Sequence, residues 1–287
     1  MTMMIIFMKI IIHGGFFSES KTNHETKVAK QEALTRIAKK SFEYLKNHSA
    51  VETVVFAVSQ LEDDALFNAG LGSQIQSDGI IRMSAALMDG ETQKMSGVIN
   101  IEKVKNPIQV AEKLLPTEDR ILGERGAIQF ARDNGFEEYS TETQERREDF
   151  NTKVKVSRTS TVGCVAFDKD GKIAVATSTG GKGYEVPGRI SDSATVAGNY
   201  ANSFCGVSLT GVGEDIVSNA TAAKIVTRVT DGMTLKQAFD KTFAELKPYD
   251  GFAGAIAIDH QGNMYHQDSH PSMVFASYDG ETIEVFE

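Results

Sequence analysis

Residues 161–181, TVGCVAFDKDGKIAVATSTGG, contain the sharpest hairpin of the sequence. Val162–Phe167 and Ile173–Thr177 are mostly small or β-branched, which is typical of buried strands. Between them, Asp168–Gly171 supplies a turn. The stretch therefore predicts two adjacent antiparallel strands, around which the rest of the chain is arranged.

The segment before this hairpin has the opposite character. Residues 136–160 are polar and crowded with charge, and they lack helical apolar periodicity over most of their length, so we expect a linker that stays out of the core. Thr161 stands where the linker meets the strand. An N-terminal nucleophile needs this arrangement, because a freed α-amino group with a pKa of about 7.7–8 can act as base for its own hydroxyl. From residue type alone, a threonine that merely forms a strand is the commoner case, and both interpretations stay open.

Patterns elsewhere in the chain indicate the fold class. The apolar run up to Ile12 predicts a buried first strand, and short alternating runs over residues 72–102 predict a β-meander. Helices are expected over residues 34–45, 124–133 and near 216–226, and further helices should begin at Asn106 and at the capping boxes Ser49/Glu52 and Thr234/Gln237. C-terminal strands are expected at 254–259 and 274–278. Strands thus cluster in two sets while helices come in pairs. We expect one α/β domain, a layered sandwich with largely antiparallel sheets.

Composition narrows the class of partner. The 287 residues are 41% hydrophobic and 24% charged, and no window approaches the roughly 20 apolar residues that span a bilayer. The net charge of −9 argues against nucleic acid and anionic membranes, because such partners need clustered Lys and Arg. Cys164 and Cys205 are too few for a disulfide scaffold and have no metal-ligand spacing. We expect a soluble cytoplasmic protein that acts on a small molecule.

Other catalytic signatures are missing from the sequence. It has no G-x-S-x-G elbow, no HExxH, no P-loop and no cysteine-protease signature. Gly211-Val212-Gly213 is a lone GxG, which more often only allows a tight turn. The sequence therefore gives no support to the enzyme classes that these signatures mark.

Short motifs in a fixed order connect Thr161 to a known family. They are IIHGG at 11–15, LFNAGLG at 66–72, LMDG at 87–90, TVGCVAFD at 161–168, ATSTGG at 176–181, PGRISDS at 187–193 and TGVGE at 210–214. Their order and spacing over about two hundred residues resemble the plant-type asparaginases and isoaspartyl peptidases. The resemblance implies an N-terminal nucleophile hydrolase with a four-layer αββα sandwich. It also implies a precursor cleaved between Ser160 and Thr161 into residues 1–160 and 161–287, and a homodimer of cleaved protomers.

The resemblance carries roles onto individual residues. Thr161 resembles the nucleophile, and Thr179 the hydroxyl that supports it. Arg189 resembles the residue that pairs with a substrate α-carboxylate, while Asp192 and the Gly213 carbonyl would hold the substrate ammonium. The Thr210 hydroxyl and the Gly211 N–H resemble an oxyanion hole, with Asn68 in the loop facing them. Without the motif, Arg189 and Asp192 would more simply be a surface ion pair.

The family also implies one structural cation and no catalytic cofactor. Its loop at residues 61–71 binds sodium through backbone oxygens, here those of Leu61, Glu62, Asp64, Phe67, Ala69 and Leu71. The acidic side chains at 62–64 are expected to form a solvated helix end rather than a catalytic cluster. His13 is expected to be a structural histidine beside a glycine turn and not a general base.

Some positions depart from the family pattern. Phe16 and Phe17 follow HGG where small residues are usual, and Ser160 stands where glycine or aspartate is common. The GG-x-GG motif is replaced by residues 250–254, and the Asn-Thr that follows it is missing around 267–270. We expect slower self-cleavage and a changed pocket wall.

The implied reaction is hydrolysis of β-aspartyl dipeptides and L-asparagine to release L-aspartate. A glycosylasparaginase-like hydrolase is the alternative within enzymes, and the lack of a signal peptide and paired cysteines argues against it. An uncleaved, non-catalytic relative that acts as a binding module is the alternative outside enzymes.

Overall fold

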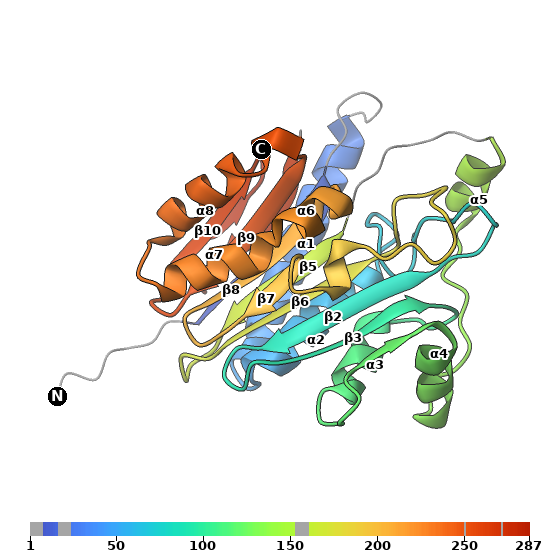
Figure 1. Ribbon diagram of the computed structural model, residues 1–287, viewed down its shortest axis with the longest axis horizontal. Coiled ribbons are helices and arrows are strands. Elements are labelled where there is room, and N and C mark those ends of the chain that lie inside the picture. The colour runs from blue at the N-terminus through green and yellow to red at the C-terminus, as the bar shows by residue number, and fades with distance from the viewer. Residues whose placement is uncertain (1–7, 17–23, 153–160, 250, 271) are drawn as a thin grey trace.

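The computed structural model describes residues 8–16, 24–152, 161–249, 251–270 and 272–287. Within them, strands and helices form a mixed α/β structure built on two sheets (Figure 1). Phe17 and Ser160, two of the positions that depart from the family pattern, lie outside the described residues.

The larger sheet contains the predicted hairpin at its centre. Its described strands follow the order β12-β11-β1-β5-β6-β2-β3-β4, with bounds β1 Lys9–Phe16, β2 Met83–Asp89, β3 Lys94–Ile101, β4 Ile121–Gly123, β5 Val162–Phe167, β6 Ile173–Thr179, β11 Met273–Tyr278 and β12 Ile283–Val285. Neighbouring strands are antiparallel except β3 and β4, which are parallel. Because β5 pairs with both β1 and β6, Thr161 enters the sheet between two ordered strands.

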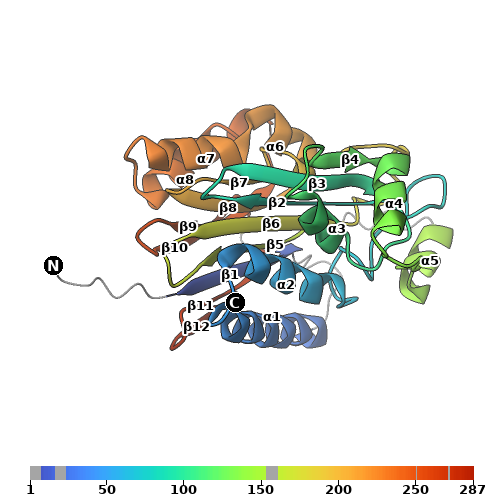
Figure 2. The ribbon, with the colours of Figure 1, turned by 90° about the horizontal axis from the view of Figure 1, so that it is seen from below.

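The smaller sheet is antiparallel and packs against the larger one. It comprises β7 Asn199–Ala201, β8 Cys205–Gly211, β9 Ala253–Asp259 and β10 Met264–Asp268, in the order β10-β9-β8-β7. Strands β8 and β9 contact β1, β5 and β6 of the larger sheet. The two sheets therefore face each other at the central hairpin (Figure 2).

Helices cover the outer faces of the two sheets (Figure 2). Those that pack on the larger sheet are α1 His24–Leu45, α2 Ala50–Glu62, α3 Pro107–Leu114 and α4 Glu124–Asp133, and those that pack on the smaller sheet are α7 Thr221–Thr230 and α8 Leu235–Ala244. The remaining helices are α5 Gln144–Asn151 and α6 Gly213–Asn219, with single 3-10 turns at Asp192–Ala194 and Lys247–Tyr249. Both predicted capping boxes, at Ser49/Glu52 and Thr234/Gln237, are confirmed.

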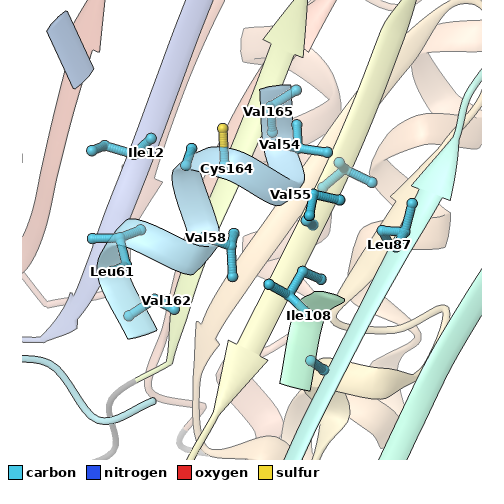
Figure 3. Close-up of a cluster of buried hydrophobic side chains, with 14 of the residues drawn as sticks. Ile12, Val54, Val55, Val58, Leu61, Leu87, Ile108, Val162, Cys164 and Val165 are labelled. Carbon is cyan, nitrogen blue, oxygen red and sulfur yellow. The ribbon is translucent and has the colours of Figure 1, made fainter. Parts of the chain in front are cut away.

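Part of the main core lies between α2 and the larger sheet (Figure 3). Val54, Val58 and Leu61 of α2 are fully buried against Val162 and Cys164 of β5. Burying each such aliphatic side chain contributes about 1.5–3 kcal/mol relative to exposure. This packing holds the strand that begins next to Thr161.

The linker prediction was wrong over residues 144–151, whereas residues 136–143 contain no helix or strand. Residues 144–151 form α5, whose N-cap Thr143 accepts a hydrogen bond from the Arg146 backbone. The Arg146 side chain is buried, and its Nε donates to the Gly72 carbonyl at 2.7 Å. Polar contacts to distant parts of the chain hold this helix, so its sequence shows no apolar periodicity. Residues 153–160 lie outside the described part.

Two smaller expectations were also wrong. Residues 72–82 contain no strand, so the expected meander is reduced to the β2–β3 hairpin, although the turn at Gly79 exists. Glu62 is fully buried rather than solvated, because Ser178 Oγ and the Ile108 backbone N–H donate to its Oε1 at 2.7 and 3.1 Å. Asp63 is exposed, as expected.

Candidate active site

Strand pairing brings two predicted hydroxyls together. Thr161 directly precedes β5 and Thr179 ends β6, and the pairing of Val162 with Ser178 fixes their separation. Thr161 Oγ1 donates to Thr179 Oγ1 at 3.3 Å, and both side chains are buried. The oxygen of the candidate nucleophile is therefore held in place by its neighbour.

Thr161 lies in a cavity of about 170 Å³. The cavity brings together five residues that the sequence predicted and five that it did not. The predicted ones are Thr161, Thr179, Arg189, Gly211 and Gly213; the others are Gly181, Lys182, Ser191, Val212 and Glu214. A cavity of this size suits an amino-acid-sized ligand rather than a polymer.

Arg189 is oriented by Glu214 of the TGVGE motif, a residue for which the motif alone implied no role. Arg189 Nε and Nη2 donate to the two carboxylate oxygens of Glu214 at 3.0 and 2.9 Å. Hydrogen bonding from Arg189 is the largest cause that lowers the pKa of Glu214 to about 2. Glu214 engages one edge of the guanidinium, so the Nη1–Nη2 edge remains for a second carboxylate.

Asp192 is the buried acid of the site. It begins the 3-10 turn Asp192–Ala194, and its Oδ1 accepts from Ser191 Oγ at 2.8 Å. Burial raises its pKa to about 6, while the Ser191 hydrogen bond and nearby Arg189 act in the opposite direction. Its Oδ2 has no hydrogen-bond partner among the described residues and lies beside Gly198, whereas Oδ1 lies beside Gly213.

Gly213 lets these groups approach one another. A Cβ at Gly213 would lie 2.8 Å from Asp192 Oδ1 and 2.9 Å from Arg189 Nη2. Any larger residue would push the acid and the guanidinium apart. Arg189, Asp192 and Gly213 thus lie next to one another, and Arg189 and Gly213 line the cavity.

Thr210 and Gly211 end strand β8 beside the nucleophile. The Thr210 hydroxyl is fully buried and has no hydrogen-bond partner among the described residues. A buried, unpaired hydroxyl costs about 1–3 kcal/mol, which a ligand oxygen could offset. Gly211 lines the cavity at φ +147°, where a Cβ would overlap the Phe252 carbonyl.

Asn68 and Ser193 support the site from outside the cavity lining. The Asn68 Nδ2 donates to the Gly181 carbonyl at 2.5 Å and its Oδ1 accepts from the Gln74 backbone at 3.1 Å. Asn68 therefore ties its loop to the segment after Thr179. Ser193, which was not singled out from the sequence, has its Oγ 3.5 Å from Thr161 Oγ1.

His13 belongs to a buried polar network behind the nucleophile. Its Nε2 lies 2.9 Å from Ser208 Oγ, which lies 2.7 Å from Thr177 Oγ1. Burial lowers the pKa of His13 to about 3, and a contact with the Thr161 backbone acts in the opposite direction. A neutral, buried histidine outside the cavity lining agrees with a structural role. Gly163 makes room for the contact, because a Cβ there would overlap both His13 and Ser208.

Phe16 does not line the cavity. It is buried with its ring centroid 4.1 Å from that of Phe252, next to β9. The Phe16 ring therefore packs into the core.

The loop expected to hold sodium is tightly turned. Gly70 and Gly72 have positive φ values of 53° and 93°, and a Cβ at Gly72 would lie 2.9 Å from the Phe67 carbonyl. The Glu62 carbonyl accepts from the Leu71 N–H at 2.7 Å. A carbonyl oxygen has two lone pairs, so this bond leaves room for a cation. Backbone carbonyl oxygens are among the ligands that a hard cation takes.

Comparison with known proteins identifies the family of this chain. A family described as Asparaginase matches residues 6–287. An isoaspartyl peptidase/L-asparaginase of Synechocystis sp. is 44% identical, covering 96% of this chain and 89% of its own. A plant-type L-asparaginase of Pyrococcus furiosus is 36% identical, and the match covers 93% of this chain and 95% of the relative. An isoaspartyl peptidase/L-asparaginase of Danio rerio is 32% identical, and the match covers 93% of this chain and 91% of the relative.

The mixed α/β fold, the hydroxyl-lined cavity and these matches define a hydrolase. The chain belongs to the asparaginase family that includes plant-type asparaginases and isoaspartyl peptidases, and the resemblance inferred from its motifs is confirmed. Among the described residues, no helix has the length and apolar character to cross a membrane.

Proposed function

We propose that this protein hydrolyses the isopeptide bond of β-aspartyl dipeptides and the side-chain amide of L-asparagine, releasing L-aspartate. The observation that carries the proposal is the position of Thr161 Oγ1 beside Thr179, in one cavity with Arg189. Relatives at 32–44% identity are named for these activities.

Thr161 is the proposed nucleophile. Its hydroxyl oxygen attacks the β-carbonyl carbon, and its own α-amino group takes the proton once the chain is cut after Ser160. The C–N bond then breaks, the leaving nitrogen departs as ammonia or an amino acid, and a β-aspartyl ester remains on Thr161. Water hydrolyses this ester to L-aspartate and restores the hydroxyl.

The surrounding groups account for recognition and for charge in the transition state. The substrate α-carboxylate binds the Nη1–Nη2 edge of Arg189, and its ammonium binds Asp192 and the Gly213 carbonyl. The Thr210 hydroxyl and Gly211 N–H receive the developing oxyanion, for which a single donor is worth about 3–4 kcal/mol in other hydrolases. The Thr210 hydroxyl, which has no partner among the described residues, and the position of Asp192 Oδ1 beside Gly213 support these assignments.

Three further features belong to the same proposal. The layers form the four-layer αββα sandwich of N-terminal nucleophile hydrolases, and the cleaved protomers pair as a homodimer. A sodium ion binds the backbone oxygens of the loop at residues 61–71 and stiffens it. Through the hydrogen bond from Asn68 to the Gly181 carbonyl, this more rigid loop would also restrict the segment after Thr179.

Mass spectrometry under denaturing conditions tests the proposal most directly. Self-cleavage before Thr161 divides the 31.2 kDa chain into pieces of about 17 and 14 kDa. Activity should rise in step with the 14 kDa piece, and slow cleavage over hours agrees with a serine at position 160. A chain that stays whole yet hydrolyses β-aspartyl dipeptides would refute the mechanism. A chain that stays whole and is inert would favour a binding module.

A further inference from the structure

A second cation shares the carboxylate that orients Arg189. Lys182 lines the cavity, and its Nζ donates to Glu214 Oε1 at 3.0 Å. The same oxygen accepts from Arg189 Nε at 3.0 Å. One carboxylate oxygen therefore bridges a guanidinium and an ammonium at the wall of the cavity.

The two contacts with Glu214 differ in strength. The Arg189 contact uses two parallel hydrogen bonds from a side chain that is 15% exposed, whereas Lys182 and Glu214 are 43% and 51% exposed. Exposed single-contact ion pairs contribute little to stability, so Lys182 can leave Glu214 for another carboxylate at small cost. Its flexible four-carbon stem allows the ammonium to move.

The proposed substrates differ in the charge of their leaving groups. Asparagine releases ammonia and carries one carboxylate, which Arg189 binds. A β-aspartyl dipeptide carries a second carboxylate on its leaving amino acid. Lys182, a cation beside Arg189 that is only weakly engaged, is opposite in charge to this second carboxylate and lies in the wall of the same cavity.

We propose that Lys182 binds the α-carboxylate of the leaving amino acid and so favours β-aspartyl dipeptides with a free C-terminus. This inference rests on the proposed function, because it assigns a specificity determinant to the same site. Lys182 acts when the dipeptide enters, by exchanging Glu214 for the substrate carboxylate. Glu214 stays on Arg189 and keeps the guanidinium oriented.

A substrate pair isolates this contact. Processed wild-type protein and Lys182→Met are compared on β-aspartyl-leucine and on β-aspartyl-leucinamide, in which a neutral amide replaces the second carboxylate. We expect the ratio of kcat/KM between the two substrates to fall about fivefold in Lys182→Met, the size of a partly exposed ion pair. Lys182→Arg should keep most of the ratio. As a matched control, Lys236→Met removes a lysine that pairs with Asp240 at 2.6 Å on α8 and should leave the ratio as in wild type.

The outcomes separate the two proposals. An unchanged ratio in Lys182→Met, or an equal loss on both substrates, would overturn the role of Lys182 while leaving the proposed function intact. Processed wild-type protein that hydrolyses neither dipeptide nor L-asparagine would overturn the proposed function, and this inference with it.

Discussion

Arg189→Lys tests the substrate clamp while keeping its charge. Arg189 holds Glu214 through Nε and Nη2 at 3.0 and 2.9 Å and presents its other edge to the cavity. A lysine ammonium is a point charge that cannot serve two carboxylates with two parallel bonds each. Losing one hydrogen bond between charged groups costs about 1.5–3 kcal/mol, so we expect kcat/KM for β-aspartyl dipeptides to fall about 10- to 150-fold.

The assay separates this loss from a folding defect. The extent of processing is measured first by mass spectrometry, and kinetics are then normalised to the processed fraction. We expect nearly normal processing, because self-cleavage does not use the clamp. Glu214→Gln is the matched control. It keeps the shape of the side chain that pairs with Arg189 but removes its charge, so it should raise KM by less than Arg189→Lys does. A variant that fails to process but whose matured fraction has normal kinetics would show that Arg189 is structural.

Three further predictions address the nucleophile, the buried acid and the core. Thr161→Ala should abolish both processing and hydrolysis, whereas Thr161→Ser retains some of each; full activity in the alanine variant would exclude Thr161 as nucleophile. Because burial raises the pKa of Asp192 to about 6, its charge is lost below that pH and KM should rise as the pH falls through 6. An Asp192→Asn variant whose KM still rises as the pH falls through 6 would argue against the assignment. Gly163→Ala should destabilise the fold by about 2–3 kcal/mol in thermal unfolding, because the new methyl group overlaps buried His13 and Ser208; an unchanged melting temperature would contradict this.

Local sequence signals predicted the elements that depend on local physics. The central hairpin follows from its small and β-branched residues, and the capping boxes at Ser49 and Thr234 follow from one residue pair each. Strands β4, β7, β8, β10 and β12 were missed. The three-residue β7 is too short to show alternation, and the Gly, Ser and Thr residues of β8 hide its apolar pattern.

Long-range polar contacts explain the remaining errors. The partner of buried Glu62 is Ser178, 116 residues away, and Arg146 of α5 bonds to Gly72, 74 residues away. No window of sequence contains both members of such a pair. For the same reason the bond between Arg189 and Glu214 could not be predicted, although the two residues stand in the motifs PGRISDS and TGVGE.

The strand order of the larger sheet has a consequence for a cleaved molecule. Strands β1, β2, β3 and β4 precede residue 160, whereas β5, β6, β11 and β12 follow it, and β1 lies between β11 and β5. If the bond before Thr161 is cut as proposed, both polypeptides still contribute strands to the same sheet. Strand β1 of the first lies between β11 and β5 of the second, and β5 and β6 of the second lie between β1 and β2 of the first. Cleavage would then leave the native assembly intact but turn its refolding into a bimolecular reaction. Maturation would thus be a one-way step: a processed molecule that unfolds can recover only by finding its missing half.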